Sequence, residues 1–147
     1  MIFRKRTALA LAPLALLACV GSAAAATIEV VKSPYCGCCQ HWIDYLRAEG
    51  FEVRVVEAED VTPTARRLGV PDDLRSCHTA TIEGYAIEGH VPAEDIRRLI
   101  AERPAAAGLA VPGMPIGSPG REQGDRRQPY ATILFTRDGQ RSDFARH

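Results

Sequence analysis

Four segments between residues 27 and 57 constrain the fold most strongly. Residues 27–32 (TIEVVK) form a short β-branched run that predicts a strand, and a turn crowded with cysteines follows it. From Cys38 to Glu49 apolar residues recur at helical spacing, and Gly50 ends the predicted helix. Residues 51–57 alternate between apolar and charged side chains, which predicts a second strand. Because such a crossover is right-handed, we expect the strands to be parallel neighbours.

The rest of the chain predicts further short elements. These are a helix over 63–68, a hairpin of strands 79–83 and 85–88 that turns at Gly84, a helix over 92–103, and a strand over 130–136 before a turn at Asp138-Gly139. Residues 104–129 are rich in proline and glycine and predict a long loop. The order predicts an α/β, thioredoxin-like fold, in which helices flank a central mixed sheet. The cysteine turn then lies at the N-terminus of the first helix, where open α/β sheets commonly place their sites.

The first 26 residues resemble a secretory signal peptide. Basic residues 4–6 precede an apolar run over 7–20, and residues 24–26 (AAA) suit cleavage before Thr27. The apolar run is shorter than the roughly 20 residues that span a bilayer, so we expect no membrane span once the signal is removed. The sequence therefore predicts an exported protein with a single domain over residues 27–147.

A second processing route involves Cys19. Residues 16–19 (LLAC) resemble a lipobox, in which Cys19 would carry the lipid and anchor a lipoprotein. We favour cleavage before Thr27, because a leucine directly before the small residue is not the preferred choice and the Ala-x-Ala site follows at once. On that interpretation Cys19 leaves with the signal, and four of the five cysteines remain.

Charge argues against a nucleic-acid partner. Without the three basic residues of the leader, 15 Lys and Arg remain against 18 Asp and Glu, a net charge of −3. No basic patch or long charge run is present in the sequence. Nucleic acid is therefore not an expected partner.

The four remaining cysteines allow several interpretations. In an exported protein, four thiols first suggest two disulfides. Cys36 and Cys39 form a C-x-x-C that is typical of thiol–disulfide redox motifs, with Cys36 as the attacking thiol. Cys38 fits neither interpretation, because a third thiol beside a disulfide promotes exchange. Cys77 directly precedes the predicted hairpin, and the thioredoxin-like layout would bring it to the same helix N-terminus.

Ligand chemistry favours a soft metal at these sulfurs. Thiolates select Cu(I), Zn(II) and iron–sulfur clusters. Structural zinc usually takes cysteines in separated pairs, unlike a C-x-C-C run with one distant cysteine. Cu(I) is therefore the favoured metal ion, with Cys36, Cys38, Cys39 and Cys77 as its ligands. Dithiol redox chemistry, zinc, an iron–sulfur cluster and plain disulfides remain open alternatives.

Other candidate residues carry weaker signals. His78 follows Cys77 and could ligate a metal or simply form a hydrogen bond. Met114 offers a soft thioether in the Pro/Gly-rich segment, either as a further copper ligand or as packing. We expect His90 to be structural or exposed, His41 to be solvated, and Trp42 to pack beneath the cysteines.

Four blocks of sequence together resemble the CopG-like family of periplasmic copper-resistance proteins. The resemblance rests on residues 31–39 with Trp42, residues 76–80, residues 84–92, and residues 108–120. It runs from about Thr27 to Phe135. A second methionine is expected after Gly120, but Arg121 stands there.

The resemblance implies a thioredoxin-like periplasmic protein that serves copper resistance. It implies that Cys36, Cys38, Cys39 and Cys77 hold Cu(I), and that the site supports Cu(I)/Cu(II) interconversion. The implied partners are copper ions and other periplasmic copper-handling proteins. A thiol–disulfide oxidoreductase using Cys36 and Cys39 is the alternative, and the sequence leaves open whether the protein is an enzyme.

Overall fold

A computed structural model describes residues 26–147, which form a mixed α/β domain. The predicted signal peptide, apart from Ala26, and the lipobox at Cys19 lie outside the described residues. The elements in chain order are β1 (Thr27–Lys32), α1 (Gly37–Ala48), β2 (Glu52–Glu57), α2 (Thr62–Arg67), the short 3-10 helix η1 (Asp72–Leu74), β3 (His78–Ile82), β4 (Tyr85–Gly89), α3 (Ala93–Glu102), β5 (Gly108–Val111), β6 (Ala131–Phe135) and β7 (Arg141–Arg146).

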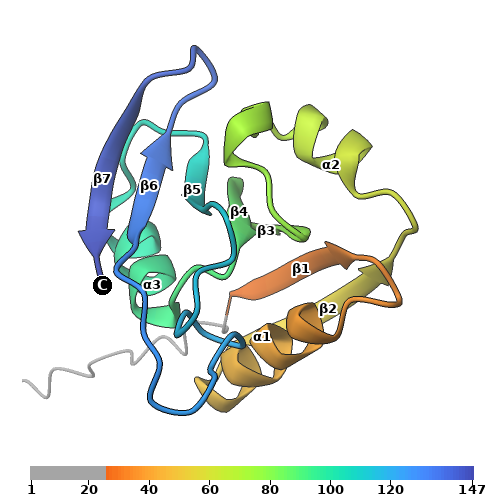
Figure 1. Ribbon diagram of the computed structural model, residues 1–147. Helices are drawn as coiled ribbons and strands as arrows, with labels where there is room; N and C mark the ends of the chain where they lie inside the picture. The colour runs from red at the N-terminus through yellow and green to blue at the C-terminus, as the bar shows by residue number, and fades with distance from the viewer. Residues whose placement is uncertain (1–25) are drawn as a thin grey trace, which may run out of the picture.

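The strands build one seven-stranded sheet in the order β2-β1-β3-β4-β5-β6-β7 (Figure 1). β1 and β2 pair in parallel, as the sequence predicted for a right-handed crossover through α1. β3 runs antiparallel to β1 and forms the predicted hairpin with β4. The cysteine turn after β1 therefore lies directly beside the entry to β3.

Helices cover both faces of the sheet. Trp42, Ile43 and Leu46 of α1 pack with α3 in the larger core cluster, which also includes Ile28 and Ile87 from the strands. Burial of each such Ile or Leu contributes about 1.5–3 kcal/mol. α2 and η1 cover the opposite face, in a smaller cluster of buried side chains: Ala65, Val70, Leu74, Ala86, Ala107, Ala110 and Phe135.

The segment 104–129 departs from the prediction of a continuous loop. Gly108–Val111 within it is strand β5, fully buried and paired in parallel with β4 and antiparallel with β6. Gly108 is required there, because a Cβ would lie 1.9 Å from the carbonyl oxygen of Ala86. The strand was missed because four residues of small and apolar type between proline-rich turns carry no periodicity. The prediction holds only for the connection between β5 and β6.

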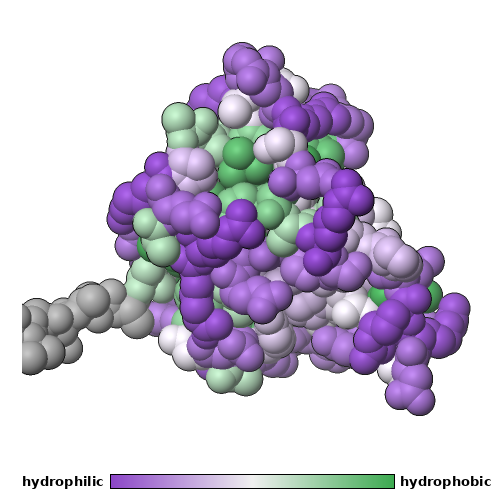
Figure 2. All heavy atoms as spheres, turned by 90° about the vertical axis from the view of Figure 1, so that its left-hand side faces the viewer, coloured by the Kyte–Doolittle hydropathy of each residue, from purple (hydrophilic) through white to green (hydrophobic). Residues whose placement is uncertain are grey.

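The last strand was also absent from the prediction. β7 pairs antiparallel with β6 across the predicted Asp138-Gly139 turn. Its sequence, RSDFAR, is mostly exposed and charged, as suits the edge of a sheet. Figure 2, which views the molecule from the left of Figure 1, shows a largely hydrophilic face with a small apolar area.

In the part of the chain that the structure describes, no helix combines the length and apolar character needed for a membrane crossing. Helix α1, which begins at the cysteine turn, has 12 residues and one exposed polar face.

Candidate metal site

The cysteine turn forms the N-terminus of α1. Cys36 is the N-cap residue, and its sulfur accepts a hydrogen bond from the backbone N–H of Cys39 at 3.3 Å. Cys38 and Cys39 therefore fall in the first helical turn, where free N–H groups and the helix dipole favour negative charge. Trp42 lies one turn further along and is fully buried, with its Nε1 donating to the Val91 carbonyl at 2.9 Å.

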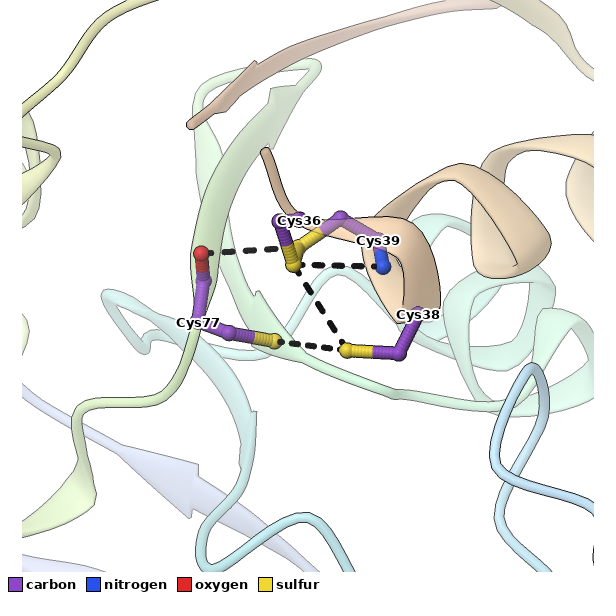
Figure 3. Close-up of side chains that lie close together, drawn as sticks. All are labelled: Cys36, Cys38, Cys39 and Cys77. Carbon is purple, nitrogen blue, oxygen red and sulfur yellow. Dashed lines mark hydrogen bonds between the residues drawn. A yellow bond between two sulfur atoms is a disulfide. The ribbon is translucent and has the colours of Figure 1, made fainter. Parts of the chain in front are cut away.

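Cys77 completes the cysteine group from a distant part of the sequence. It lies in the loop before β3, and Figure 3 shows its side chain and that of Cys38 pointing toward one another. Their sulfurs are 3.8 Å apart, and Cys38 Sγ is 3.5 Å from Cys36 Sγ. The ligand atoms of all four cysteines lie within 4.8 Å of one another. The expected return of Cys77 to the helix N-terminus is confirmed.

The group is not four free thiols. Cys36 and Cys39 form a disulfide, and Cys38 and Cys77 are free. Cys39 is fully buried, and its sulfur lies 3.5 Å from the carbonyl oxygen of Cys77 (Figure 3). The C-x-x-C pairing that the sequence left open is therefore present, with a third thiol held directly against it.

The spacing between the two free thiols suits a shared metal ion. Two thiolates on a tetrahedral ion at about 2.3 Å would have sulfurs about 3.8 Å apart. The distance between Cys38 Sγ and Cys77 Sγ is 3.8 Å. Sulfur donors at this spacing fit a soft metal.

Burial and the adjacent Cys38 thiol raise the pKa of Cys77 to about 12. Without metal, the Cys77 thiol therefore keeps its proton at neutral pH. Metal ligation needs the thiolate, so binding at Cys77 has to displace this proton and strengthens as the pH rises.

Two histidines extend the group on the side of Cys77. His90 Nε2 lies 3.3 Å and His78 Nδ1 lies 3.4 Å from Cys77 Sγ. Both rings are fully buried, and burial lowers both pKa values, that of His78 to about 3. Both imidazoles are therefore neutral at physiological pH, which is the form that ligates metals.

His90 was expected to be structural or exposed, and its contact with Cys77 was missed. This contact could have been predicted from the register of the hairpin. Thr79 pairs with Glu88, and the same register continued by two residues places Cys77 opposite His90. Side chains of directly opposed residues in an antiparallel pair lie on the same face.

A buried carboxylate, that of Glu88, supports the Cys77 loop. Glu88 accepts hydrogen bonds from the Ser76 N–H at 2.6 Å and from the Thr79 hydroxyl at 2.7 Å. It thereby ties together Ser76 and Thr79, the residues on either side of Cys77 and His78. Burial raises the pKa of Glu88 to about 7. Sequence reasoning did not single out this residue.

Two of the other candidate residues, Met114 and His41, are exposed. Met114 follows β5, in a left-handed backbone conformation, and is 36% exposed. Its carbonyl accepts from Arg121 Nε at 3.4 Å. A role for Met114 as a copper ligand remains a prediction. His41 is exposed, as expected.

Fold and site together define a class: a mixed α/β domain with a cysteine group, suited to a soft metal, at the N-terminus of its first helix. The chain matches two solved structures of "Copper resistance protein copG". Form 2 is 47% identical with a TM-score of 0.81, and covers 84% of this chain and 99% of its own. Form 1 is 48% identical with a TM-score of 0.78, and covers 82% of this chain and 96% of its own.

The chain belongs to this CopG-like family of copper resistance proteins, as the sequence resemblance indicated. Residues 74–121 also match a family described as "Protein of unknown function, DUF411". That stretch includes Cys77, His78 and His90. No match to a curated protein is found.

Proposed function

We propose that this chain is an exported, periplasmic copper-binding protein, which holds Cu(I) on the sulfurs of Cys36, Cys38, Cys39 and Cys77 in the service of copper resistance. The observation that carries the proposal is the convergence of these four ligand atoms within 4.8 Å. Membership of a family of copper resistance proteins supports copper as the metal. Softness of the donors supports Cu(I) as its oxidation state.

The disulfide limits when all four sulfurs are available. Reduction of the Cys36–Cys39 bond takes two electrons and two protons, which a dithiol reductant can supply, and yields two thiols beside Cys38 and Cys77. Only then can every sulfur ligate. In the oxidised form the sulfurs of Cys38 and Cys77 alone are free to bind as thiolates.

The same bond gives the site a means of changing copper's oxidation state. The thiolates of Cys36 and Cys39 can give one electron to each of two Cu(II) ions and join as the disulfide, which leaves two Cu(I) ions. The reverse uses the disulfide as the oxidant of two Cu(I) ions. Interconversion of the two states is part of the proposal, and the disulfide in the structure supports it.

A copper titration tests the binding proposal. The exported protein is reduced anaerobically, loaded with Cu(I), freed of excess copper, and analysed for copper per chain by elemental analysis. We expect tight uptake that Cys38→Ser and Cys77→Ser each abolish or reduce several-fold, and that His41→Ala, at an exposed histidine of α1, leaves unchanged. Uptake no greater than that of a variant lacking all four cysteines would refute the proposal.

A thiol–disulfide oxidoreductase is the second candidate, favoured by the C-x-x-C disulfide at the helix N-terminus. We propose with it that the β1–α1–β2 crossover, the β3–β4 hairpin and α3 form a thioredoxin-like core. In this case insulin reduction would survive Cys38→Ser and be lost in Cys36→Ser. Copper uptake by the reduced protein without insulin reduction leaves only the first candidate.

Export is tested by the mature N-terminus. We expect mass spectrometry of the protein from the periplasmic fraction to show a chain that begins at Thr27. A lipid-modified chain beginning at Cys19 would instead establish the lipoprotein alternative.

A further inference from the structure

Cys77, His78 and His90 gather at the open end of the β3–β4 hairpin, beside the disulfide but without including its cysteines. One ligand atom from each lies within 4.8 Å of those of the other two. The two imidazoles approach Cys77 Sγ at 3.3 and 3.4 Å, His90 from directly after β4 and His78 from the start of β3. Their rings meet edge to face, with centroids 5.1 Å apart.

The orientation of His90 is fixed by a hydrogen bond on its far side. Its Nδ1 lies 2.8 Å from the carbonyl oxygen of Pro119. A carbonyl only accepts, so Nδ1 carries the proton and the neutral ring has a free lone pair on Nε2. That lone pair is directed at Cys77 Sγ. A histidine held by one ring nitrogen and free at the other is the usual arrangement of a metal ligand.

His78 is held by packing instead. Its ring lies over Trp42, with centroids 4.4 Å apart, and is fully buried. Nδ1 faces Cys77 Sγ, while Nε2 has no hydrogen-bond partner among the residues that the structure describes. The stacking on Trp42 therefore holds the ring with Nδ1 toward the sulfur.

The two sulfur–nitrogen distances match those around a tetrahedral ion. Typical metal–sulfur and metal–nitrogen bonds of about 2.3 and 2.0 Å place sulfur and nitrogen about 3.5 Å apart. The two observed distances, 3.3 and 3.4 Å, differ from this by a few tenths of an ångström or less. Each imidazole is therefore already placed to share an ion with the Cys77 sulfur.

We propose that Cys77, His78 and His90 form a second metal subsite, which takes a divalent ion of the zinc and Cu(II) type. One thiolate with two imidazoles is a borderline donor set, harder than four thiolates, and imidazole suits zinc and copper. Three protein ligands leave one position open. Because neither Cys36 nor Cys39 takes part, the subsite remains complete when these two residues are joined as the disulfide.

The subsite shares Cys77 with the proposed copper site, and it rests on the proposed function to the extent that both need this thiolate. The two sites need opposite redox states of Cys36 and Cys39. Four-sulfur binding of Cu(I) needs the reduced protein, whereas the histidine subsite works in the oxidised one. The redox state therefore separates them experimentally.

Cobalt(II), the spectroscopic substitute for zinc, provides the test. Oxidised protein is first shown by alkylation and mass spectrometry to have two free cysteines, and is then titrated anaerobically with Co(II). We expect one Co(II) per chain, with a thiolate-to-cobalt charge-transfer band and the visible bands of a tetrahedral site. X-ray absorption on the same sample should show nitrogen and sulfur ligands together.

Variants assign the ligands. His90→Asn keeps an N–H donor near the position of Nδ1 but removes Nε2, and His78→Gln removes Nδ1. We expect each of these, and Cys77→Ser, to weaken Co(II) binding by at least roughly tenfold in chelator competition, since even the loss of an outer-shell partner costs that much. His41→Ala is the matched control and should bind as the unmodified protein does.

The outcomes are distinct. Absence of Co(II) uptake by the oxidised protein, a cobalt site without imidazole nitrogen in the absorption spectrum, or binding unchanged in both His90→Asn and Cys77→Ser overturns the subsite. Since X-ray absorption uses the unmodified protein, poor folding of a variant does not decide the result. Cu(I) uptake by reduced protein without Co(II) uptake by oxidised protein rejects the subsite and keeps the proposed function. Co(II) uptake by oxidised protein without Cu(I) uptake by reduced protein keeps the subsite and rejects the proposed function.

Discussion

At the scale of single residues, burial shifts the pKa of Cys77 and of two groups close to it, His78 and Glu88. Burial lowers the pKa of His78 to about 3 and raises that of Glu88 to about 7, and the Cys77 thiol is kept protonated. Cys77 and His78 are therefore neutral at physiological pH, whereas Glu88 is about half protonated near pH 7. Burial of neutral donors costs little free energy, while the thiol and the imidazoles can still become metal ligands.

The raised pKa of Glu88 predicts a pH dependence of stability. A group whose pKa is higher in the native state stabilises it fully below the unfolded value of 4.5, and this contribution is lost as the pH rises through about 7. His78 acts in the opposite direction, since its lowered pKa costs stability as the pH falls below 6.5. A comparison with Glu88→Gln separates the two.

We expect the free energy of unfolding of the metal-free protein, relative to that of Glu88→Gln, to decrease by about 2 kcal/mol between pH 5 and pH 8. Urea unfolding of both proteins across this range measures it. Parallel stability curves for the two proteins would show that Glu88 does not titrate in this window.

At the scale of elements, the connection between β5 and β6 closes over the first turn of α1. Gly120 has a φ of +79°, and a Cβ there would lie 2.6 Å from the backbone nitrogen of Trp42 and 3.1 Å from the Cys38 carbonyl oxygen. Only glycine permits this approach. The preceding residue, Pro119, provides the carbonyl that orients His90. The connection therefore shapes the site although it contributes no cysteine.

Gly120→Ala should destabilise the protein by about 2 kcal/mol or more, since a left-handed conformation and a backbone clash act together. Gly124→Ala is the matched control, because Gly124 also has a positive φ but has nothing within 4 Å of its Cβ position. We expect that variant to lose only about 1 kcal/mol. Equal losses in urea unfolding would mean that the contact with α1 is not tight.

At the scale of the whole molecule, the last residue ties the edge of the sheet to α3. His147 Nε2 lies 2.9 Å from the buried Asp95 carboxylate, which also accepts from the Thr132 hydroxyl. The His147 ring stacks on Tyr130, and the backbones of these two residues exchange hydrogen bonds. The end of β7, the start of β6 and the first turn of α3 are thereby held at one place.

We expect His147→Ala to reduce the free energy of unfolding by about 1–3 kcal/mol, because the buried Asp95 would lose a partner. His147→Gln, which can keep a donor near Nε2, should recover part of this loss. Thermal and urea unfolding of the two variants test the prediction. A stability of His147→Ala equal to that of the unmodified protein would show that the contact contributes nothing.

The sequence by itself determined the local elements and the position of the cysteines on them. The strand, helix and strand over residues 27–57 and the hairpin at Gly84 were predictable, because periodicity and glycine or proline punctuation are local signals. Cys36, Cys38 and Cys39 were placed at the helix N-terminus for the same reason. The return of Cys77 followed from the order of the elements.

Only the tertiary structure decided the features that depend on contacts between distant segments. β5 is a strand because β4 and β6 offer hydrogen bonds on both sides, and nothing in Gly108–Val111 alone requires it. The disulfide selects Cys39 rather than Cys77 as the partner of Cys36, and four cysteines alone allow three pairings. His90 becomes a neighbour of Cys77 only through the hairpin register and the Pro119 carbonyl, because side-chain direction is set by packing across the chain.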